Sequence, residues 1–176
     1  MRRVTGALFA LLLFAASAST LSAQQSVYMM VDSINGDQVA PHNREFKLNS
    51  FSFATTNSMT ISTATGGAGA SKAAFGAVKI SMRLNAATTP SFHKHLVAGT
   101  RLPSIEIRLY NAANKVFYKT VFESAYLTSI TTEGADESVQ TIEFVYIKAR
   151  WVMPADPAAG ASEKSACWDI VQNRTC

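Results

Sequence analysis

The sequence predicts an all-β fold with one short helix, in which two antiparallel sheets pack together as a compact barrel or sandwich. From Val27 onward, apolar and polar residues mostly alternate with period two, the pattern of strands that bury one face. Turn-forming residues separate these segments, as they do in sandwiches and barrels. Hydrophobic residues make up 48% of the 176 residues and charged residues 16%, which is enough apolar material for one sizeable core.

Residues 1–23 have the composition of a secretory signal peptide. Two arginines precede the apolar run Ala7–Ala16, and small residues offer cleavage positions after Ala18 or Ala23. The run is shorter than the roughly 20 residues that a membrane-spanning helix needs. We therefore expect cleavage during export and a soluble mature chain in the periplasm or outside the cell, without stable membrane insertion.

Residues 24–153 are expected to form the β domain, which begins with two strands. The first, Val27–Ile34, alternates regularly and ends at an Asn-Gly turn signal. Between Glu45 and Ala54 the alternation changes phase, which predicts a bulge or a sharp bend near Asn49.

The stretch Thr60–Lys72 is rich in Thr, Ser, Gly and Ala and contains Gly66, Gly67 and Gly69. It is longer than a hairpin connection requires, and long loops of this kind are often functional. A phosphate-binding loop would need glycine directly before the lysine, where this chain has Ser71. We therefore expect a flexible excursion rather than a nucleotide site.

A single helix is expected to interrupt the strands. Thr89 can cap it, Pro90 suits its first turn, and Gly99 suits the position just after its end. Phe92 and Leu96 lie four residues apart and share a face, so we expect them to close one end of the sheet structure.

Further strands are expected at Val78–Asn85, Ile105–Asn111, Val116–Ile130 and Val139–Met153. The last one is apolar on both faces: Phe144 and Tyr146 lie on one, and Val145, Ile147 and Trp151 lie on the other. Because the domain buries only one face in its own core, the second face needs a cover. The cover is either a neighbouring subunit or the chain's own helix or C-terminal tail.

Candidate catalytic and metal-binding patterns are incomplete. Ser91 and Lys94 form the S-x-x-K pattern of penicillin-recognising enzymes, but the accompanying motifs are missing, so a polar helix face is the simpler interpretation. His93 and His95 point to different sides of a helix and have no third ligand nearby in sequence. We expect no enzyme activity, no metal and no cofactor. The net charge of +4 includes two arginines at the start, and no other basic cluster exists, so we expect no nucleic-acid binding.

Residues 154–176 are expected to be a linker and a C-terminal tail, which contains both cysteines of the chain. Export would place Cys167 and Cys176 in an oxidising compartment, and their spacing allows a loop with the Cα atoms within bridging distance. We therefore predict a Cys167–Cys176 disulfide. The alternative is two free thiols in a disordered end.

The ordered series of strands, loop and helix resembles the Hcp family (hemolysin-coregulated protein), the tube-forming subunit of bacterial type VI secretion. No single motif is specific, and the likeness, from about Ser26 to Met153, depends on the order of the segments. These segments are VYMMVDSINGD, REFKLNSFSFATT, the Gly-rich loop, AFGAVKISMRLN, TPSFHKHLVAGT, IEIRLYN, YLTSITTEG and ESVQTIEFVYIKARWVMP. The ending CWDIVQNRTC is also similar to an aromatic–Asp–three residues–Asn tail in one branch of the family.

The resemblance implies a compact β-barrel, six copies closing into a ring, and rings stacking into a tube, with secretion-system components or effector cargo as further partners. It also implies that the Thr60–Lys72 loop, with its glycines, reaches a neighbouring ring. The strand Val139–Met153 would partly face a neighbouring subunit, with Phe144 and Tyr146 at the subunit interface. The signal peptide departs from the family, because its tubes assemble in the cytoplasm. An internal start at Met29 or Met30 would cut into the first strand.

The leading hypothesis is therefore an exported, ring- or tube-forming structural protein associated with type VI secretion. An exported binding module that kept the fold without tube assembly is the alternative. A hydrolase is disfavoured because the sequence shows no nucleophile–base pair.

Overall fold

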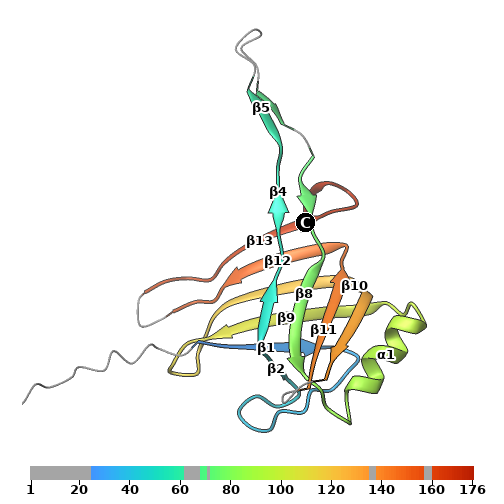
Figure 1. The fold of residues 1–176 in the computed structure, drawn as a ribbon. Coiled ribbons are helices and arrows are strands. Elements are labelled where there is room, and N and C mark those ends of the chain that lie inside the picture. Colours follow the sequence, from blue (N-terminus) through green and yellow to red (C-terminus); the bar gives the residue numbers. More distant parts are fainter. Residues whose placement is uncertain (1–24, 62–67, 71, 135–137, 157–159) are drawn as a thin grey trace, which may run out of the picture.

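The computed structural model describes residues 25–61, 68–70, 72–134, 138–156 and 160–176, and two antiparallel sheets build the body of the molecule (Figure 1). The predicted signal peptide lies outside the described residues. One sheet contains β1 (Ser26–Val31), β2 (Phe46–Leu48), β9 (Leu102–Tyr110), the first half of β10 (Val116–Glu133), β12 (Lys148–Met153), β13 (Lys164–Asp169) and β14 (Arg174–Thr175). The other contains the second half of β10 with β11 (Val139–Val145), β8 (Val78–Arg83) and β3 (Ser50–Ser52). The predicted all-β class with one short helix is confirmed.

Bent strands carry the chain from one sheet to the other. β2 pairs with β1, whereas β3, which begins two residues after β2 ends, pairs with β8, so the bend falls at Asn49 as predicted. β10 pairs with β12 as far as Glu123 and with β11 from Tyr126, and Ser124 between them has a φ of 53°. Such irregular positions let a strand turn from one sheet into another. In the described part of the chain, the hydrogen-bonded strand order runs from β14 to β3 without closing on itself, so the fold is a sandwich rather than a closed barrel.

The hydrophobic core lies between the sheets. Phe122 on β10 and Phe144 on β11 meet edge-on, with ring centroids 5.4 Å apart. The helix α1 (Thr89–Val97) covers one end of the core, where the Phe92 ring lies 5.3 Å from that of Phe46 and Leu96 packs alongside. Each large apolar side chain buried in this way contributes roughly 1.5–3 kcal/mol, so the core is the main source of stability.

The ends of α1 follow the sequence signals except at the cap. Thr88 rather than Thr89 is the N-cap residue, and its side chain makes no capping hydrogen bond. Thr89 Oγ1 instead accepts a hydrogen bond from the backbone N–H of Asn85 at 3.0 Å. Gly99 follows the C-cap with a φ of 59°, a left-handed conformation that favours glycine. No helix in the described part of the chain is long and apolar enough to span a bilayer.

A β-hairpin arm projects from the sandwich, away from the end that carries α1 (Figure 1). Its base pairs β4 (Thr55–Thr56) with β7 (Ala74–Phe75), and its outer part pairs β5 (Met59–Ile61) with β6 (Ala68–Ala70). The excursion predicted at Thr60–Lys72 is therefore built partly from paired strands. Gly69 lies in β6, whereas Gly66 and Gly67 fall outside the described residues.

The C-terminal segment, expected to be a linker and a tail, adds two strands to the first sheet. β13 pairs with β12 along its whole length, and β14 pairs with β13 at Trp168 and Asp169. The chain thus ends in a short hairpin rather than in an unpaired tail.

Candidate assembly surfaces

Phe144 and Tyr146 are buried, contrary to the prediction that they lie at a subunit interface. Phe144 is fully buried and Tyr146 is 7% exposed, and both rings contact Phe122, with centroids 5.4 and 4.6 Å away. They therefore cannot form an exposed interface in the folded subunit.

The physical reason is a corner in the chain between two strands, which the alternation of apolar residues does not reveal. The predicted strand Val139–Met153 is two strands, β11 and β12, with a break at Tyr146 and Ile147. In β11 the core contains Phe144, whereas in β12 it contains Ala149, with Trp151 packed against it. The apolar residues on both apparent faces thus reflect mainly a change of core-facing parity at the corner, whereas Val145 stays 43% exposed.

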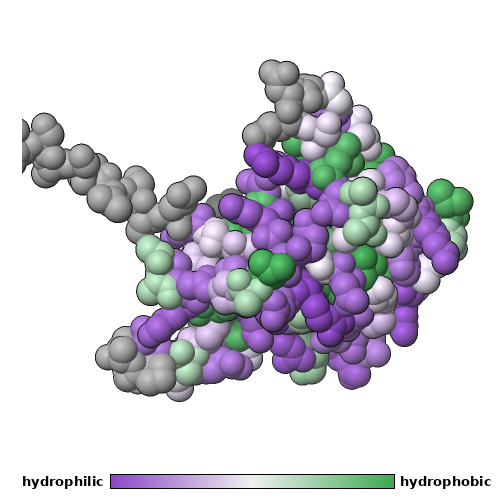
Figure 2. Space-filling view, turned by 90° about the horizontal axis from the view of Figure 1, so that it is seen from below, coloured by the Kyte–Doolittle hydropathy of each residue, from purple (hydrophilic) through white to green (hydrophobic). Residues whose placement is uncertain are grey.

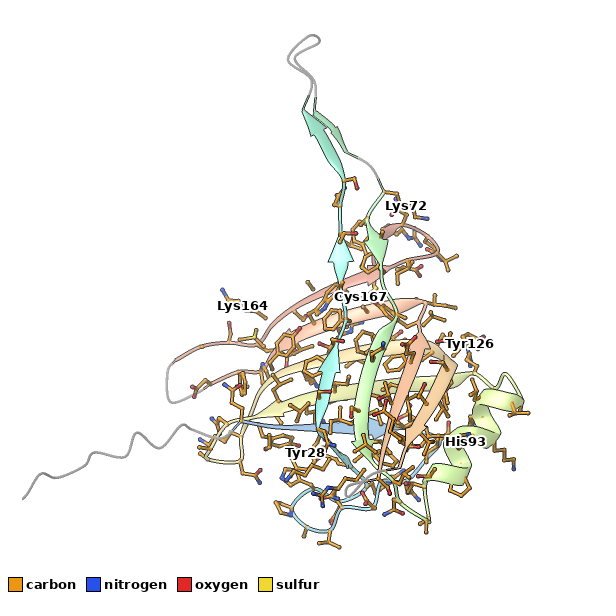
Figure 3. All side chains as sticks on the ribbon, in the orientation of Figure 1. Tyr28, Lys72, His93, Tyr126, Lys164 and Cys167 are labelled. Carbon is orange, nitrogen blue, oxygen red and sulfur yellow. A yellow bond between two sulfur atoms is a disulfide. The ribbon has the colours of Figure 1, made fainter. Side chains whose placement is uncertain are left out.

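An exposed apolar pair lies close to this corner. Tyr126 and Val145 face each other across β10 and β11, and they are 37% and 43% exposed. Figure 3 shows Tyr126 on the flank of the sandwich that carries these strands. Farther along β11, Glu143 forms an ion pair with Lys79 of β8 at 2.7 Å, so the apolar pair has polar neighbours. A small apolar centre with a polar surround is the common anatomy of a protein–protein contact.

The end of the molecule that carries α1 has a different surface. Seen from that end, hydrophobic residues are scattered singly among hydrophilic ones and form no broad patch (Figure 2). Single exposed apolar residues are normal on soluble proteins. The flank with Tyr126 is therefore the better candidate for a contact between subunits.

A buried polar cluster, which the sequence analysis missed, fixes the loop between β1 and β2. Glu45 Oε1 accepts hydrogen bonds from Arg108 Nη1 at 2.7 Å and from the Tyr110 hydroxyl at 2.9 Å. Its Oε2 lies 2.8 Å from His42 Nδ1, and the His42 ring stacks on Tyr28 at 3.8 Å. The loop is thereby clamped onto β1 and β9. Arg108 and Tyr110 are 63 and 65 residues from Glu45 in sequence, so no local motif reveals the cluster.

The charges of this cluster balance one another. Burial alone would lower the pKa of Arg108, but the hydrogen bond and charge of Glu106, aided by Tyr110 and Glu45, outweigh it and raise that pKa. Burial and the hydrogen bond to Glu45 raise the pKa of Tyr110. Because each of these groups is engaged with another, the arrangement is a structural clamp rather than an acid–base centre.

The polar residues singled out on the helix separate into two groups. Ser91, Lys94 and His95 line a cavity between α1 and the loop after β1. His93 is exposed on the helix, at the opposite end of the molecule from Lys72 on the arm (Figure 3). Across residues 25–176, leaving aside the undescribed gaps, no three His, Cys, Asp or Glu side chains come together as a metal site.

Comparison with known proteins identifies the fold. A family model described as the type VI secretion system effector Hcp matches residues 28–152, which run from β1 to β12 and include the arm and α1. This chain belongs to the Hcp family. The resemblance in segment order is thereby confirmed.

Solved Hcp structures share the fold at low sequence identity. Hcp1 from Salmonella typhimurium has a TM-score of 0.71 and 15% identity, covering 86% of this chain and 99% of its own. A structure described as a type six secretion system protein has a TM-score of 0.77 and 19% identity, covering 87% and 100%. A type VI secretion system effector from Yersinia pestis has a TM-score of 0.67 and 14% identity, covering 81% and 98%. No curated protein matches the chain.

The C-terminal hairpin of this Hcp protein lies beyond the residues that the family model matches. Cys167 and Cys176 are joined by a disulfide, with Cα atoms 5.4 Å apart. The bond lies next to the paired residues Trp168 and Thr175, so it ties β14 to β13. The structure thus contains the cysteine pairing that the spacing predicts.

Asp169 supports the same hairpin. Its Oδ1 accepts a hydrogen bond from the backbone N–H of Gln172 at 2.8 Å, and Lys148 lies 3.5 Å from its other oxygen. The backbone hydrogen bond from Gln172, together with the charge of Lys148, lowers the pKa of Asp169. Hydrogen bonds at the turn therefore reinforce the covalent link.

Proposed function

We propose that this Hcp protein is exported and assembles into six-membered rings that stack into a tube in a type VI secretion system. The observation that carries the proposal is the family match over residues 28–152, which includes a projecting arm. Among the described residues, β4 pairs with β7 and β5 pairs with β6, and none of these four strands pairs with a strand of the sandwich. A projecting hairpin leaves backbone edges and side chains that a neighbouring ring can cover.

The flank with Tyr126 and Val145 is proposed as one side of the contact within a ring. A ring interface joins two different patches of the subunit and closes when the rotation is right. Because both residues are already partly covered, complete burial would contribute about 1 kcal/mol each, repeated at every interface of the ring.

Native mass spectrometry and analytical ultracentrifugation of the chain beginning at Gln24 test the ring. We expect a species of six copies. Val145→Asp should shift it toward monomer, because the charge would be buried at the contact. Val97→Asp is the matched control, since Val97 is 87% exposed at the end of α1. Equal effects of the two substitutions would contradict the placement of the interface, and a wild-type monomer at tens of micromolar would contradict the ring itself.

Replacing residues 57–72 by a tight turn tests the role of the arm. The base strands β4 and β7 stay in place, so the sandwich should keep its stability. We expect single rings in electron micrographs where the intact chain forms stacks. Stacks of unchanged length would show that the arm does not join rings.

Export before assembly is the remaining part of the proposal. N-terminal sequencing of the exported protein should find Ser19 or Gln24 as its first residue. An internal start at Met29 does not replace this route, because Val27 and Tyr28 pair with both β2 and β9 and would be lost. Secretion-system components or effector cargo are the further partners we propose. A clean monomer in the mature protein would favour the alternative, an exported binding module with the same fold.

A further inference from the structure

A cavity of about 630 Å³ lies between α1 and the loop that follows β1. One wall is the loop segment 33–37, and the other includes Thr88, Ser91, Lys94 and His95. Its volume lies within the range of small-molecule sites, about 300–1,000 Å³. The cavity is separate from the Tyr126 flank and from the arm.

The helix wall presents hydrogen-bond donors. Thr88, Ser91 and His95 succeed one another at intervals of three and four residues, so they share one side of the helix. The exposed Lys94 also lines the cavity, and it forms no ion pair within the described ranges. Phe92, by contrast, is buried in the core. The polar side of α1 is therefore the one that lines the cavity.

Two buried polar atoms on this wall have no protein partner. Thr88 is 5% exposed, and its Oγ1 makes no hydrogen bond to any described residue, although it stands at the N-cap. His95 Nδ1 is also buried without a partner there. Buried polar groups are almost always hydrogen-bonded, so two such atoms in residues that line the cavity together with Lys94 indicate an acceptor from outside the chain. An anionic oxygen is the acceptor that suits hydroxyl, imidazole and ammonium donors together.

The loop wall limits the charge of this acceptor. Asp37 accepts hydrogen bonds from Asn85 Nδ2 at 2.8 Å and from Gln38 Nε2 at 3.1 Å, which ties the loop to the residues before α1. Both donors are neutral amides, so neither offsets the charge of the Asp37 carboxylate on the wall opposite Lys94. A ligand group with a single negative charge is favoured over a phosphate, which carries about −1.5 to −2.

We propose that the cavity binds one carboxylate group of a peptide-sized ligand. The carboxylate accepts hydrogen bonds from Thr88, Ser91 and His95 and pairs with Lys94. A peptide C-terminus and an acidic side chain share this chemistry. The site does not depend on ring assembly.

Ligand-observed saturation-transfer NMR on the chain beginning at Gln24 tests the proposal with three probes. Acetyl-Gly-Gly-Gly offers a C-terminal carboxylate, acetyl-Gly-Glu-Gly-amide offers a side-chain carboxylate, and acetyl-Gly-Gly-Gly-amide offers none. We expect at least one acid to bind and the neutral amide not to bind, and preference for one acid identifies the source. Equal binding of the neutral amide, or no binding of either acid at several millimolar, would overturn the proposal.

Three variants locate the site. Lys94→Gln should weaken binding of the acid about tenfold, as expected for the loss of one charge-assisted hydrogen bond. Lys115→Gln is the matched control, since Lys115 is an exposed lysine in the turn between β9 and β10. Asp37→Asn keeps an oxygen acceptor for Asn85 but removes the repulsive charge, so it should tighten binding. Unchanged affinity in Lys94→Gln, or weaker binding in Asp37→Asn, would refute the assignment.

Discussion

Replacing Glu45 by alanine should destabilise the folded chain by about 3 kcal/mol. The Glu45 side chain is 3% exposed, and its two oxygens accept hydrogen bonds from Arg108 and Tyr110 and contact His42. Removing one member of a buried ion pair typically costs about 3–5 kcal/mol, because the other charge is left without its partner. The lower end of this energy range applies to Glu45→Ala, because the Arg108 side chain is one-quarter exposed and its Nε keeps the ion pair with Glu106 Oε1 at 2.6 Å.

Urea unfolding followed by tryptophan fluorescence measures this cost. Glu45→Gln keeps the volume and one oxygen acceptor, so it should cost about half as much. Glu143→Gln is the control, because its ion pair with Lys79 is at the surface and should contribute under about 1 kcal/mol. A double-mutant cycle with Arg108→Met should recover part of the loss caused by Glu45→Ala. If Glu45→Ala lies within about 1 kcal/mol of the wild type, the clamp does not hold the loop as argued.

Three more outcomes follow from the structure. Gly36→Ala should destabilise the chain strongly in thermal unfolding, because its Cβ would overlap a backbone carbonyl of the loop, whereas Gly134→Ala has open space and should be neutral. By circular dichroism, Phe144→Asp should unfold the subunit rather than release folded monomers, and Tyr146→Phe should cost nothing, because the buried Tyr146 hydroxyl has no partner among the described residues. The folded pKa of Asp169 is below its unfolded value of about 3.9, so its stabilisation is present above that value and is lost as the pH falls through the lower folded value. Hydrogen exchange in β13 and β14 should therefore rise in the wild type as the pH falls through the lowered pKa of Asp169, and Asp169→Asn should remove that pH dependence.

The sequence predicted the local features of this fold well. Alternation marked the strands, and the phase change at Asn49 located the bend between β2 and β3 because it is a purely local event. The Pro90 and Gly99 signals bracketed the helix to within a residue, although the cap is Thr88. These signals succeed because they describe how neighbouring residues share a backbone conformation.

The failures share a different cause, since they depend on which distant segments meet. Phe144 and Val145 look equally suited to a core, and only the corner between β11 and β12 decides that Phe144 is buried and Val145 is exposed. The Glu45 clamp is assembled across 63 residues, and no spacing in the sequence connects Glu45 with Arg108. The cavity beside α1 also requires the loop after β1 as its second wall. The motif Ser91-x-x-Lys94 could be recognised in the sequence, but the loop segment that faces it across the cavity could not.

The two features outside the matched part of the chain favour the same compartment. Residues 1–23 have the composition of an export signal, and near the other end of the sequence Cys167 and Cys176 form a disulfide. Disulfides persist in oxidising compartments and are rare in a reducing cytoplasm. An Hcp subunit that assembled only in the cytoplasm would gain little from this pair, whereas an exported subunit gains a hairpin whose loop closure contributes roughly 2–3 kcal/mol. If thiol labelling of the exported, unreduced protein found two free cysteines, the disulfide would be absent. The proposal of export would then depend only on the composition of residues 1–23.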